Sequence, residues 1–222
     1  MFIAKDAPLL YRCLQRLVWG LLKVIARLDV TGIENVPRSG PVLIAPNHLH
    51  SLDIPLVGLV IPRHPTVFAA DKWRGKLGGK ILELGTQVIY VARGEADREA
   101  LGEALKVLKA GRTLAIAPEG TRSRTGGLQT GKHGAVYLAS RSGAAIVPLA
   151  IWGQEKALDA WRHLRRPALH AHIGAPILLP PSAARARLSE LETITDDLML
   201  TLARMLPAEY RGVYADRVTD AG

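Results

Sequence analysis

Cysteine and aromatic residues are scarce in this chain of 222 residues, and long uncharged apolar runs are missing. The single cysteine, Cys13, excludes an intramolecular disulfide and fits a reducing compartment. Aromatic residues make up only 5%, which leaves few platforms for stacking the bases of single-stranded nucleic acid. The longest charge-free apolar run, residues 142–154, is shorter than the roughly 18 residues that a membrane-spanning helix needs. We therefore expect a chain that does not cross the membrane.

Positive charge is what the chain has in excess. Lys and Arg number 29 against 20 Asp and Glu, which gives a formal net charge of +9. Such a balance indicates an anionic partner, and nucleic acid, an anionic membrane surface and a phosphorylated substrate all remain open. The hydrophobic content of 48% suits one globular α/β domain with a sizeable core.

The N-terminal segment, residues 9–28, has the periodicity of an amphipathic helix. Its basic residues fall within about 60° of one another on a helical projection. They are Arg12, Arg16, Lys23 and Arg27, and Trp19 lies at the edge of their stripe. Such a helix either lies in a membrane surface or packs on the domain with its arginines facing water, and periodicity alone does not separate the two. The basic residues interrupt the apolar stretch and no cleavage site follows, so we do not expect a signal peptide.

Beyond residue 40, short apolar runs alternate with helical stretches, which is typical of a largely parallel sheet covered on both faces. The predicted strands are residues 41–46, 66–70, 87–93, 113–118, 144–151 and 168–174. The predicted helices lie near residues 53–60, 72–84, 95–110, 132–142, 155–164 and 184–205. We expect an α/β fold with a mostly parallel central sheet flanked by helices. Residues 1–30 would form the N-terminal helical unit and residues 31–222 the main domain.

The sequence NHLHSLD, residues 47–53, follows the first of these strands, at the end where open α/β sheets bind ligands. On one continuous helix, His48 and Asp53 would lie about 140° apart and could not meet. If Ser51 is the N-cap of a helix that begins after it, the preceding loop can fold His48 back beside Asp53. A histidine held by a carboxylate can act as general base toward a hydroxyl. Taken alone, the spacing is weak evidence and favours a histidine that caps or packs a loop.

A second polar segment, APEGTRSRTGG at residues 117–127, also directly follows a predicted strand. Glu119 is unfavourable to bury unpaired, and Arg122, three residues on, is its obvious local partner or a second ligand contact. Gly120 lets the backbone turn with its amides outward, which with Arg122 and Arg124 makes a place for an anion. The alternative is a charged surface turn.

Two further patterns are too incomplete to indicate a ligand. The spacing of Gly126, Gly131 and Lys132 approaches that of a phosphate-binding P-loop, but a histidine replaces the Ser or Thr that would hold magnesium and no strand precedes it. His170 and His172 share a face of one predicted strand, with no third ligand nearby in sequence. We therefore expect neither an NTPase nor a metal site.

Four segments, in this order, resemble the glycerolipid acyltransferase family typified by bacterial 1-acyl-glycerol-3-phosphate acyltransferase. They are NHLHSLD, VIYVARG, APEGTRS and AAIVPLAI, and the similarity runs from about residue 30 to residue 177. The resemblance implies the α/β fold of that family. It also implies transfer of a fatty acyl group from acyl-CoA or acyl carrier protein to the free hydroxyl of a lysophospholipid. The acceptor it suggests is 1-acyl-glycerol-3-phosphate, which gives phosphatidic acid, and no cofactor is needed.

The same resemblance implies roles for individual residues. His48 corresponds to the general base and Asp53 to its orienting partner. The acceptor phosphate and, at the proline, the acyl chain would be bound by Lys72, Arg93, Glu119, Gly120, Thr121, Arg122 and Pro148. The match at Lys72 is looser than the others. His50 stands where the family usually has serine, and Ala117 where it has an aromatic residue, which puts acceptor or acyl-length preference in doubt.

Because acceptor and product are lipids, the resemblance favours membrane docking for the helix at residues 9–28, with the protein peripheral on the cytoplasmic face of the cell membrane. The expected partners are the acyl carrier, the lysophospholipid and an anionic membrane surface, and no nucleic acid. Alternatives are a paralogue with another lyso-lipid acceptor, a catalytically silent lipid-binding or membrane-binding relative, and a basic nucleic-acid-binding protein. No helix-turn-helix or zinc-finger pattern supports the last.

Overall fold

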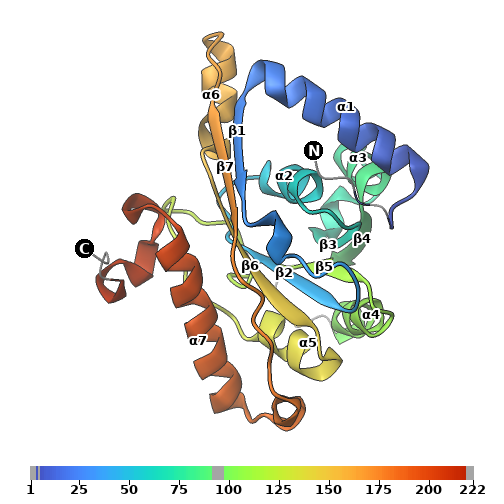
Figure 1. Cartoon of the computed structure of the whole chain (residues 1–222), viewed down its shortest axis with the longest axis vertical. Helices are drawn as coiled ribbons and strands as arrows, with labels where there is room; N and C mark the ends of the chain where they lie inside the picture. Colours follow the sequence, from blue (N-terminus) through green and yellow to red (C-terminus); the bar gives the residue numbers. More distant parts are fainter. Residues whose placement is uncertain (1–3, 5, 92–97, 219–222) are drawn as a thin grey trace.

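The computed structural model describes Ala4, residues 6–91 and residues 98–218. One seven-stranded sheet, with the order β1-β7-β6-β2-β5-β3-β4, forms its centre (Figure 1). All neighbouring strands pair in parallel except β6 and β7, which are antiparallel. The strands are β1 (Arg27–Thr31), β2 (Val42–Pro46), β3 (Pro65–Ala70), β4 (Gln87–Val91), β5 (Thr113–Ala115), β6 (Ala145–Trp152) and β7 (Ala168–Ile173). The mostly parallel sheet predicted from the sequence is confirmed.

Helices cover both faces of this sheet, because alternate residues of a strand point to opposite sides. In β2, Leu43 and Ala45 pack with α4, α5 and α7, whereas Val42 and Ile44 pack with α2 on the other face. Strands buried on both faces read as continuous apolar runs, which is why β2 and β6 were predictable. The helices are α1 (Leu9–Ile25), α2 (Asp53–Val60), α3 (Leu77–Gly85), α4 (Arg98–Lys109), α5 (Gly134–Ser142), α6 (Ala157–Arg162) and α7 (Leu188–Met205).

Helix α1 packs against α2 and α3 through an unusual face. Tyr11, Gln15 and Trp19, four residues apart, are its buried side chains. Gln15 donates to the carbonyl oxygens of Gly58 and Leu59, and the Tyr11 hydroxyl also donates to Gly58. The polar and aromatic side of α1 therefore faces the protein. Trp19, predicted at the edge of the basic stripe, faces the protein as well.

The end of α1 differs from the prediction. The helix stops at Ile25 rather than Leu28, and Arg27, expected on its basic stripe, begins β1. The sequence did not predict β1 because an edge strand that alternates exposed and half-buried residues presents no apolar run. Arg166 and Trp161 donate to backbone carbonyls of α1 and Ala26, which secures this end. The expected division of the chain at residue 30 falls inside β1.

Two other boundaries shift. α3 begins at Leu77 rather than near residue 72, because Asp71–Trp73 form a 3₁₀ turn and Gly75 has positive φ. The helix predicted from residue 95 is described from Arg98. Within the part of the chain that the structure describes, no helix has the length and apolarity to cross a membrane.

Candidate active site

Several of the predicted site residues lie at the carboxyl edge of the sheet. The NHLHSLD segment follows β2 and Glu119 follows the adjacent strand β5. Lys72 lies in the 3₁₀ turn after β3, the next strand along. Parallel strands bring their carboxyl ends to one edge, so segments 70 residues apart in sequence become neighbours.

His48 and Asp53 form a direct side-chain pair. The Nδ1 of His48 lies 2.6 Å from Oδ2 of Asp53, and the exposed fractions of the two side chains are 21% and 3%. Oδ2 also accepts the backbone N–H of His50 at 2.9 Å. Because Nδ1 is hydrogen-bonded to the carboxylate, Nε2 is the ring nitrogen that could contact a substrate. The predicted meeting of these two side chains is confirmed.

The start of α2 is built differently from the prediction. Ser51 was expected to be its N-cap, but the helix begins at Asp53 with Leu52 at the cap position and no side-chain cap. Instead, the ring Nδ1 of His50 accepts the N–H of Leu52, at 3.3 Å. The histidine that replaces the family's usual serine thus takes part in the turn that brings His48 back to Asp53.

Glu119 is buried, and its partners are backbone amides. Its Oε1 accepts the N–H of His48 at 2.7 Å and its Oε2 accepts the N–H of Gln129 at 2.9 Å. The expected local pairing with Arg122 is wrong, because both oxygens are used by backbone donors and Arg122 is exposed. Burial raises the pKa of Glu119 above its usual value, against the opposing effect of the Gln129 and His48 amides.

The segment after Glu119 wraps around His48. The N–H of Ser123 donates to the carbonyl oxygen of His48 at 2.7 Å, and Gly120 makes the turn with a φ of 68°. The side chain of Lys132 lies over Gly120, so closely that a Cβ there would touch it. Thr121 and Arg122 are exposed. This loop therefore presents cations beside a histidine whose backbone it holds on both sides.

Two buried amides complete the surroundings, and the sequence reasoning missed both. Asn47 exchanges two hydrogen bonds with the backbone of Ile151, which joins the histidine loop to β6. Gln154 donates from Nε2 to Oδ1 of Asp53 at 2.8 Å. Asn47 directly precedes the histidine and could have been singled out, whereas no local signal marks Gln154, 101 residues from its partner.

The remaining predicted residues are less directly placed. Pro148 is buried within β6, level with Ala45 of β2, where the ladder to β7 is interrupted and a missing N–H is tolerated. Lys72 is exposed, with its Nζ 5.7 Å from the ring of Trp73. Arg93 lies outside the described residues. His170 stacks on Trp152 in the sheet and has its Nδ1 3.3 Å from Asp29.

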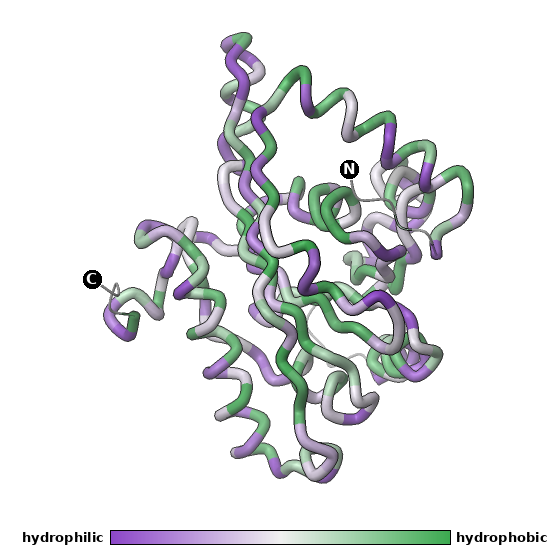
Figure 2. Tube along the Cα trace, in the orientation of Figure 1, coloured by the Kyte–Doolittle hydropathy of each residue, from purple (hydrophilic) through white to green (hydrophobic). Residues whose placement is uncertain are grey.

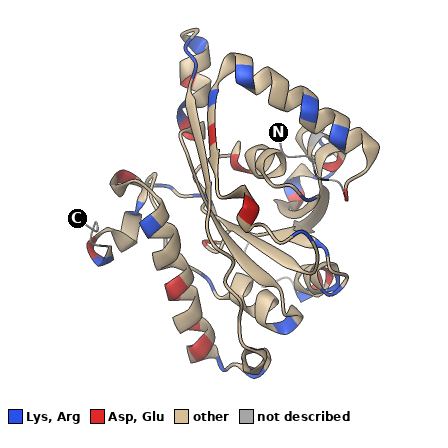
Figure 3. Ribbon diagram, viewed as in Figure 1, with Lys and Arg blue, Asp and Glu red and all other residues tan. Residues whose placement is uncertain are grey.

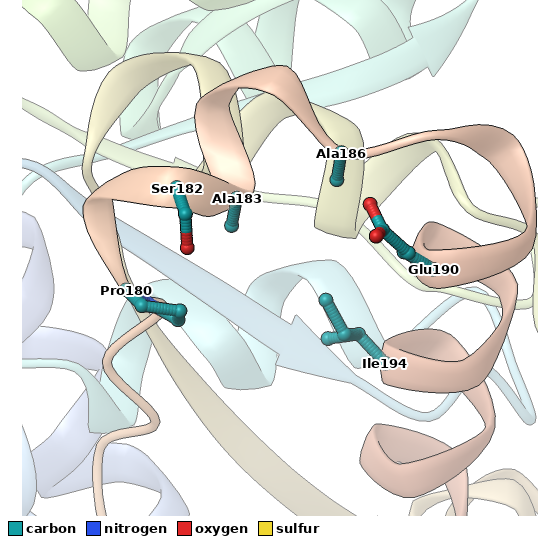
Figure 4. Close-up of a pocket in the computed structure, with 6 residues that line it drawn as sticks. All are labelled: Pro180, Ser182, Ala183, Ala186, Glu190 and Ile194. Atoms are coloured by element: carbon teal, nitrogen blue, oxygen red, sulfur yellow. The ribbon is translucent and has the colours of Figure 1, made fainter.

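A small pocket elsewhere contains none of these residues. It has a volume of about 180 Å³ and lies between the 3₁₀ segment Pro181–Arg185 and the first turns of α7, with Ser182, Glu190 and Ile194 in its wall (Figure 4). The candidate site is therefore the group of polar residues at the carboxyl edge of the sheet. There, a neutral imidazole held by a carboxylate can accept a proton from a hydroxyl beside an anion-binding loop.

The chain is similar to known acyltransferases. The Acyltransferase family model matches residues 27–152. A 1-acyl-sn-glycerol-3-phosphate acyltransferase from Borreliella burgdorferi is 33% identical over 129 residues, which cover 57% of this chain and 51% of that protein. A lyso-ornithine lipid O-acyltransferase from Pseudomonas aeruginosa is 33% identical over 142 residues, or 62% of this chain and 54% of that one.

Among solved structures, the 1-acyl-sn-glycerophosphate acyltransferase of Thermotoga maritima shares the fold, with a TM-score of 0.65 at 23% identity over 85% of this chain and 76% of that one. The alignments span about half the length of the two relatives above. The family match includes His48, Asp53 and the Glu119–Arg122 segment, and it covers more than half of the chain. This chain belongs to the acyltransferase family.

Proposed function

We propose that the protein transfers a fatty acyl group from an acyl thioester to the free hydroxyl of a lysophospholipid. The observation that carries the proposal is the His48–Asp53 pair, with the Glu119–Arg122 loop bonded to the backbone of the same histidine. A base and an anion-binding loop in one place suit an acceptor that has a hydroxyl near a phosphate. The names of the relatives support the same class of reaction.

In the proposed reaction, the acceptor itself is the nucleophile. Nε2 of His48 takes the proton from the acceptor hydroxyl as its oxygen attacks the thioester carbonyl carbon. Asp53, bonded to Nδ1, stabilises the imidazolium that forms. When the C–S bond breaks, His48 returns the proton to the departing thiolate, and the ester oxygen remains on the lipid. No acyl-enzyme intermediate is required.

Phosphate recognition falls to the cations of the carboxyl edge. Arg122 follows the turn at Gly120, and the side chain of Lys132 packs against that glycine. Lys72 follows the end of β3 and extends the same set. Arg93, which the family resemblance assigns to the same phosphate, lies outside the described residues. A phosphate in this place would meet charge-assisted donors from separate segments.

Phosphatidic acid synthesis from 1-acyl-glycerol-3-phosphate is the reaction we favour, because most of the similar curated proteins are named 1-acyl-sn-glycerol-3-phosphate acyltransferases. A lyso-ornithine lipid is the second candidate acceptor, since one relative of equal identity bears that activity in its name. The acyl donor is coenzyme A or acyl carrier protein.

The protein docks on the membrane through α1. The helix turns leucine and valine side chains away from the protein, with Leu17 69% and Val24 70% exposed, and apolar segments run along its length in Figure 2. The exposed leucines Leu77 and Leu84 belong to α3, which packs beside it. Basic residues are spaced along α1 in Figure 3, which favours an anionic lipid surface on the cytoplasmic side.

The test is acyl transfer by the purified chain, with acyl-CoA and acyl carrier protein as donors and a panel of lysophospholipids and lyso-ornithine lipid as acceptors. We expect acceptor-dependent release of thiol and formation of a diacyl lipid. His48→Ala should lose about 10²- to 10⁴-fold in turnover if general-base catalysis is removed. A folded protein that is inactive with every pair, or a His48→Ala variant with a near-native rate, would refute the proposal.

A further inference from the structure

Gln154 contacts the proposed active site from outside the matched family region. It follows β6, its side chain is only 1% exposed, and its Nε2 lies 2.8 Å from Oδ1 of Asp53. The two other bonds to this carboxylate, from His48 and the backbone of His50, both end on Oδ2. Among the described residues, Gln154 is therefore the one hydrogen-bond donor to the second carboxylate oxygen, and it comes from a separate segment.

The orientation of the Gln154 amide is set by this contact. A carboxylate at neutral pH only accepts hydrogen bonds, so the NH₂ group must face Asp53. The carbonyl Oε1 then points into a buried place where no donor of the described residues reaches it. A buried acceptor without a donor costs stability. The amide therefore donates to Asp53 through Nε2 while its Oε1 is left without a donor among the described residues.

The turn that carries Gln154 is itself constrained. Gly153 has a φ of 90°, and a side chain there would collide with the backbone of Ala168. The N–H of Gly153 donates to Glu155, and the other oxygen of Glu155 accepts the hydroxyl of Tyr210. Tyr210 belongs to the C-terminal 3₁₀ segments, Ala208–Tyr210 and Gly212–Arg217. The turn that places Gln154 beside Asp53 is therefore fixed by Gly153 and, through Glu155, by Tyr210.

We propose that Gln154 is a positioning residue for the acyl transfer: it fixes the plane of the Asp53 carboxylate, so that Oδ2 faces Nδ1 of His48. This inference rests on the proposed function for its effect on turnover. With Oδ1 held by Gln154, the carboxylate cannot rotate about its Cβ–Cγ bond without losing a buried bond. The imidazole is kept with Nε2 toward the acceptor hydroxyl.

Gln154→Met tests this in the full-length protein, because methionine has the same length and no N–H donor. We expect kcat to fall about 10- to 100-fold, as when the outer partner of a catalytic group is removed. KM for donor and acceptor should stay nearly constant, since Gln154 is buried behind Asp53. In proton NMR, the downfield Nδ1–H signal of His48, expected from a bond of 2.6 Å, should shift or broaden.

Asn35→Leu is the matched control. Its amide donates to the backbone of Ile173 at 2.9 Å, so the variant also loses a long-range amide bond but leaves Asp53 untouched. It should lose stability without changing kcat or the Nδ1–H signal. Gln154→Leu provides the same comparison if the methionine variant does not fold.

Native kcat together with an unchanged Nδ1–H signal in a folded Gln154→Met variant would overturn the proposal. A lower kcat with an unchanged signal would also overturn it, since the effect would then be only structural. If the wild-type protein transfers no acyl group, the proposed function fails, but the NMR comparison still decides whether Gln154 positions His48 through Asp53.

Discussion

Arg122 is an exposed residue in a loop whose backbone is tied to His48. If it binds the acceptor phosphate, Arg122→Ala should weaken acceptor binding by about 1.5–3 kcal/mol, the range for a lost charge-assisted bond. Donor KM should hardly change. Arg122→Lys should rescue only part of the loss, because lysine cannot offer two parallel donors. Steady-state kinetics with each substrate varied in turn measure the effect on the acceptor and on the donor separately.

The control for Arg122 is Arg38→Ala, which removes an equally exposed charge from the segment before β2. It should leave acceptor and donor kinetics near native values. Equal damage to donor and acceptor kinetics in Arg122→Ala would contradict phosphate recognition by this residue.

Glu119 makes stability depend on pH. Its folded pKa is raised above the ordinary 4.5 by burial, so the folded protein holds this proton more tightly than the unfolded chain does. The contribution to stability is therefore complete below the unfolded pKa and is lost as pH rises through the folded pKa. Glu119→Gln cannot titrate, so the free energy of unfolding of wild type minus that of the variant should fall as pH rises.

Urea denaturation of both proteins at several pH values from about 4 to about 7 measures this difference. A difference that grows with pH would mean that the two backbone amides, rather than burial, dominate the carboxyl group. The same experiment on Glu192→Gln, an exposed acid on α7, controls for the general effect of removing one acid.

At the scale of the element, α1 is attached to the domain by polar groups. Tyr11 donates to Gly58 at 2.5 Å, and burial, with the nearby Asp6, raises the pKa of its phenol above the usual value. Its contribution is intact below the unfolded pKa of about 10 and is lost as pH rises through the folded pKa. Tyr11→Phe should lower stability at pH 7 by about 0.5–1.5 kcal/mol.

The alkaline decline of Tyr11→Phe should be shallower than that of the wild type, because phenylalanine has no proton to lose. Denaturation at about pH 7 and about pH 11 separates the two effects. Tyr137→Phe, on α5, is the control. An alkaline decline in Tyr11→Phe as steep as in wild type would show that this phenol is not responsible.

The exposed face of α1 should bind the membrane independently of the buried face that attaches the helix to the domain. Replacing Leu17 and Val24 together by glutamine should leave folding nearly unchanged, since both side chains are exposed. Binding to anionic vesicles should weaken strongly, because each apolar side chain buried in lipid is worth about 1.5–3 kcal/mol. High salt should loosen wild-type binding without abolishing it, as each basic residue adds only about 1 kcal/mol.

Vesicle sedimentation, with circular dichroism to check folding, provides the measurement. The matched control replaces Leu178 and Val213, which are 76% and 62% exposed on other segments, and should sediment like wild type. A folded Leu17/Val24 variant that still sediments fully would exclude this face as the membrane contact.

At the scale of the whole molecule, segments beyond the family match complete the site. The loop after Glu119 is held by the C-terminal 3₁₀ segments, through bonds of Leu128 to the backbone of Tyr210 and of Gly131 to the hydroxyl of Tyr214. Gln154 and Glu155 join the same region to Asp53. The matched region supplies His48 and Asp53, and segments beyond it contact Asp53 and the loop after Glu119.

The sequence by itself determined the features with a local signature. Six of the seven strands are apolar runs, and the helix periods placed α2 and α7 near their observed ends. The meeting of His48 with Asp53 was predicted from their spacing together with the order of the four family motifs, because the spacing alone favoured a loop histidine. Each of these depends on neighbours in the chain, whose geometry is set by backbone sterics and burial.

Only the tertiary structure decided the rest, because the partners are distant in sequence. Periodicity shows that α1 has two faces, but the carbonyl groups at the end of α2 decided that Tyr11 and Gln15 point inward. Likewise Glu119 accepts hydrogen bonds from the backbone amides of His48 and Gln129 rather than pairing with Arg122. Gln154 donates to Asp53, 101 residues away in sequence. Almost every residue has a backbone N–H, so the residue types do not show which N–H a side chain will bind. A contact between remote segments forms only once the sheet has brought their ends together.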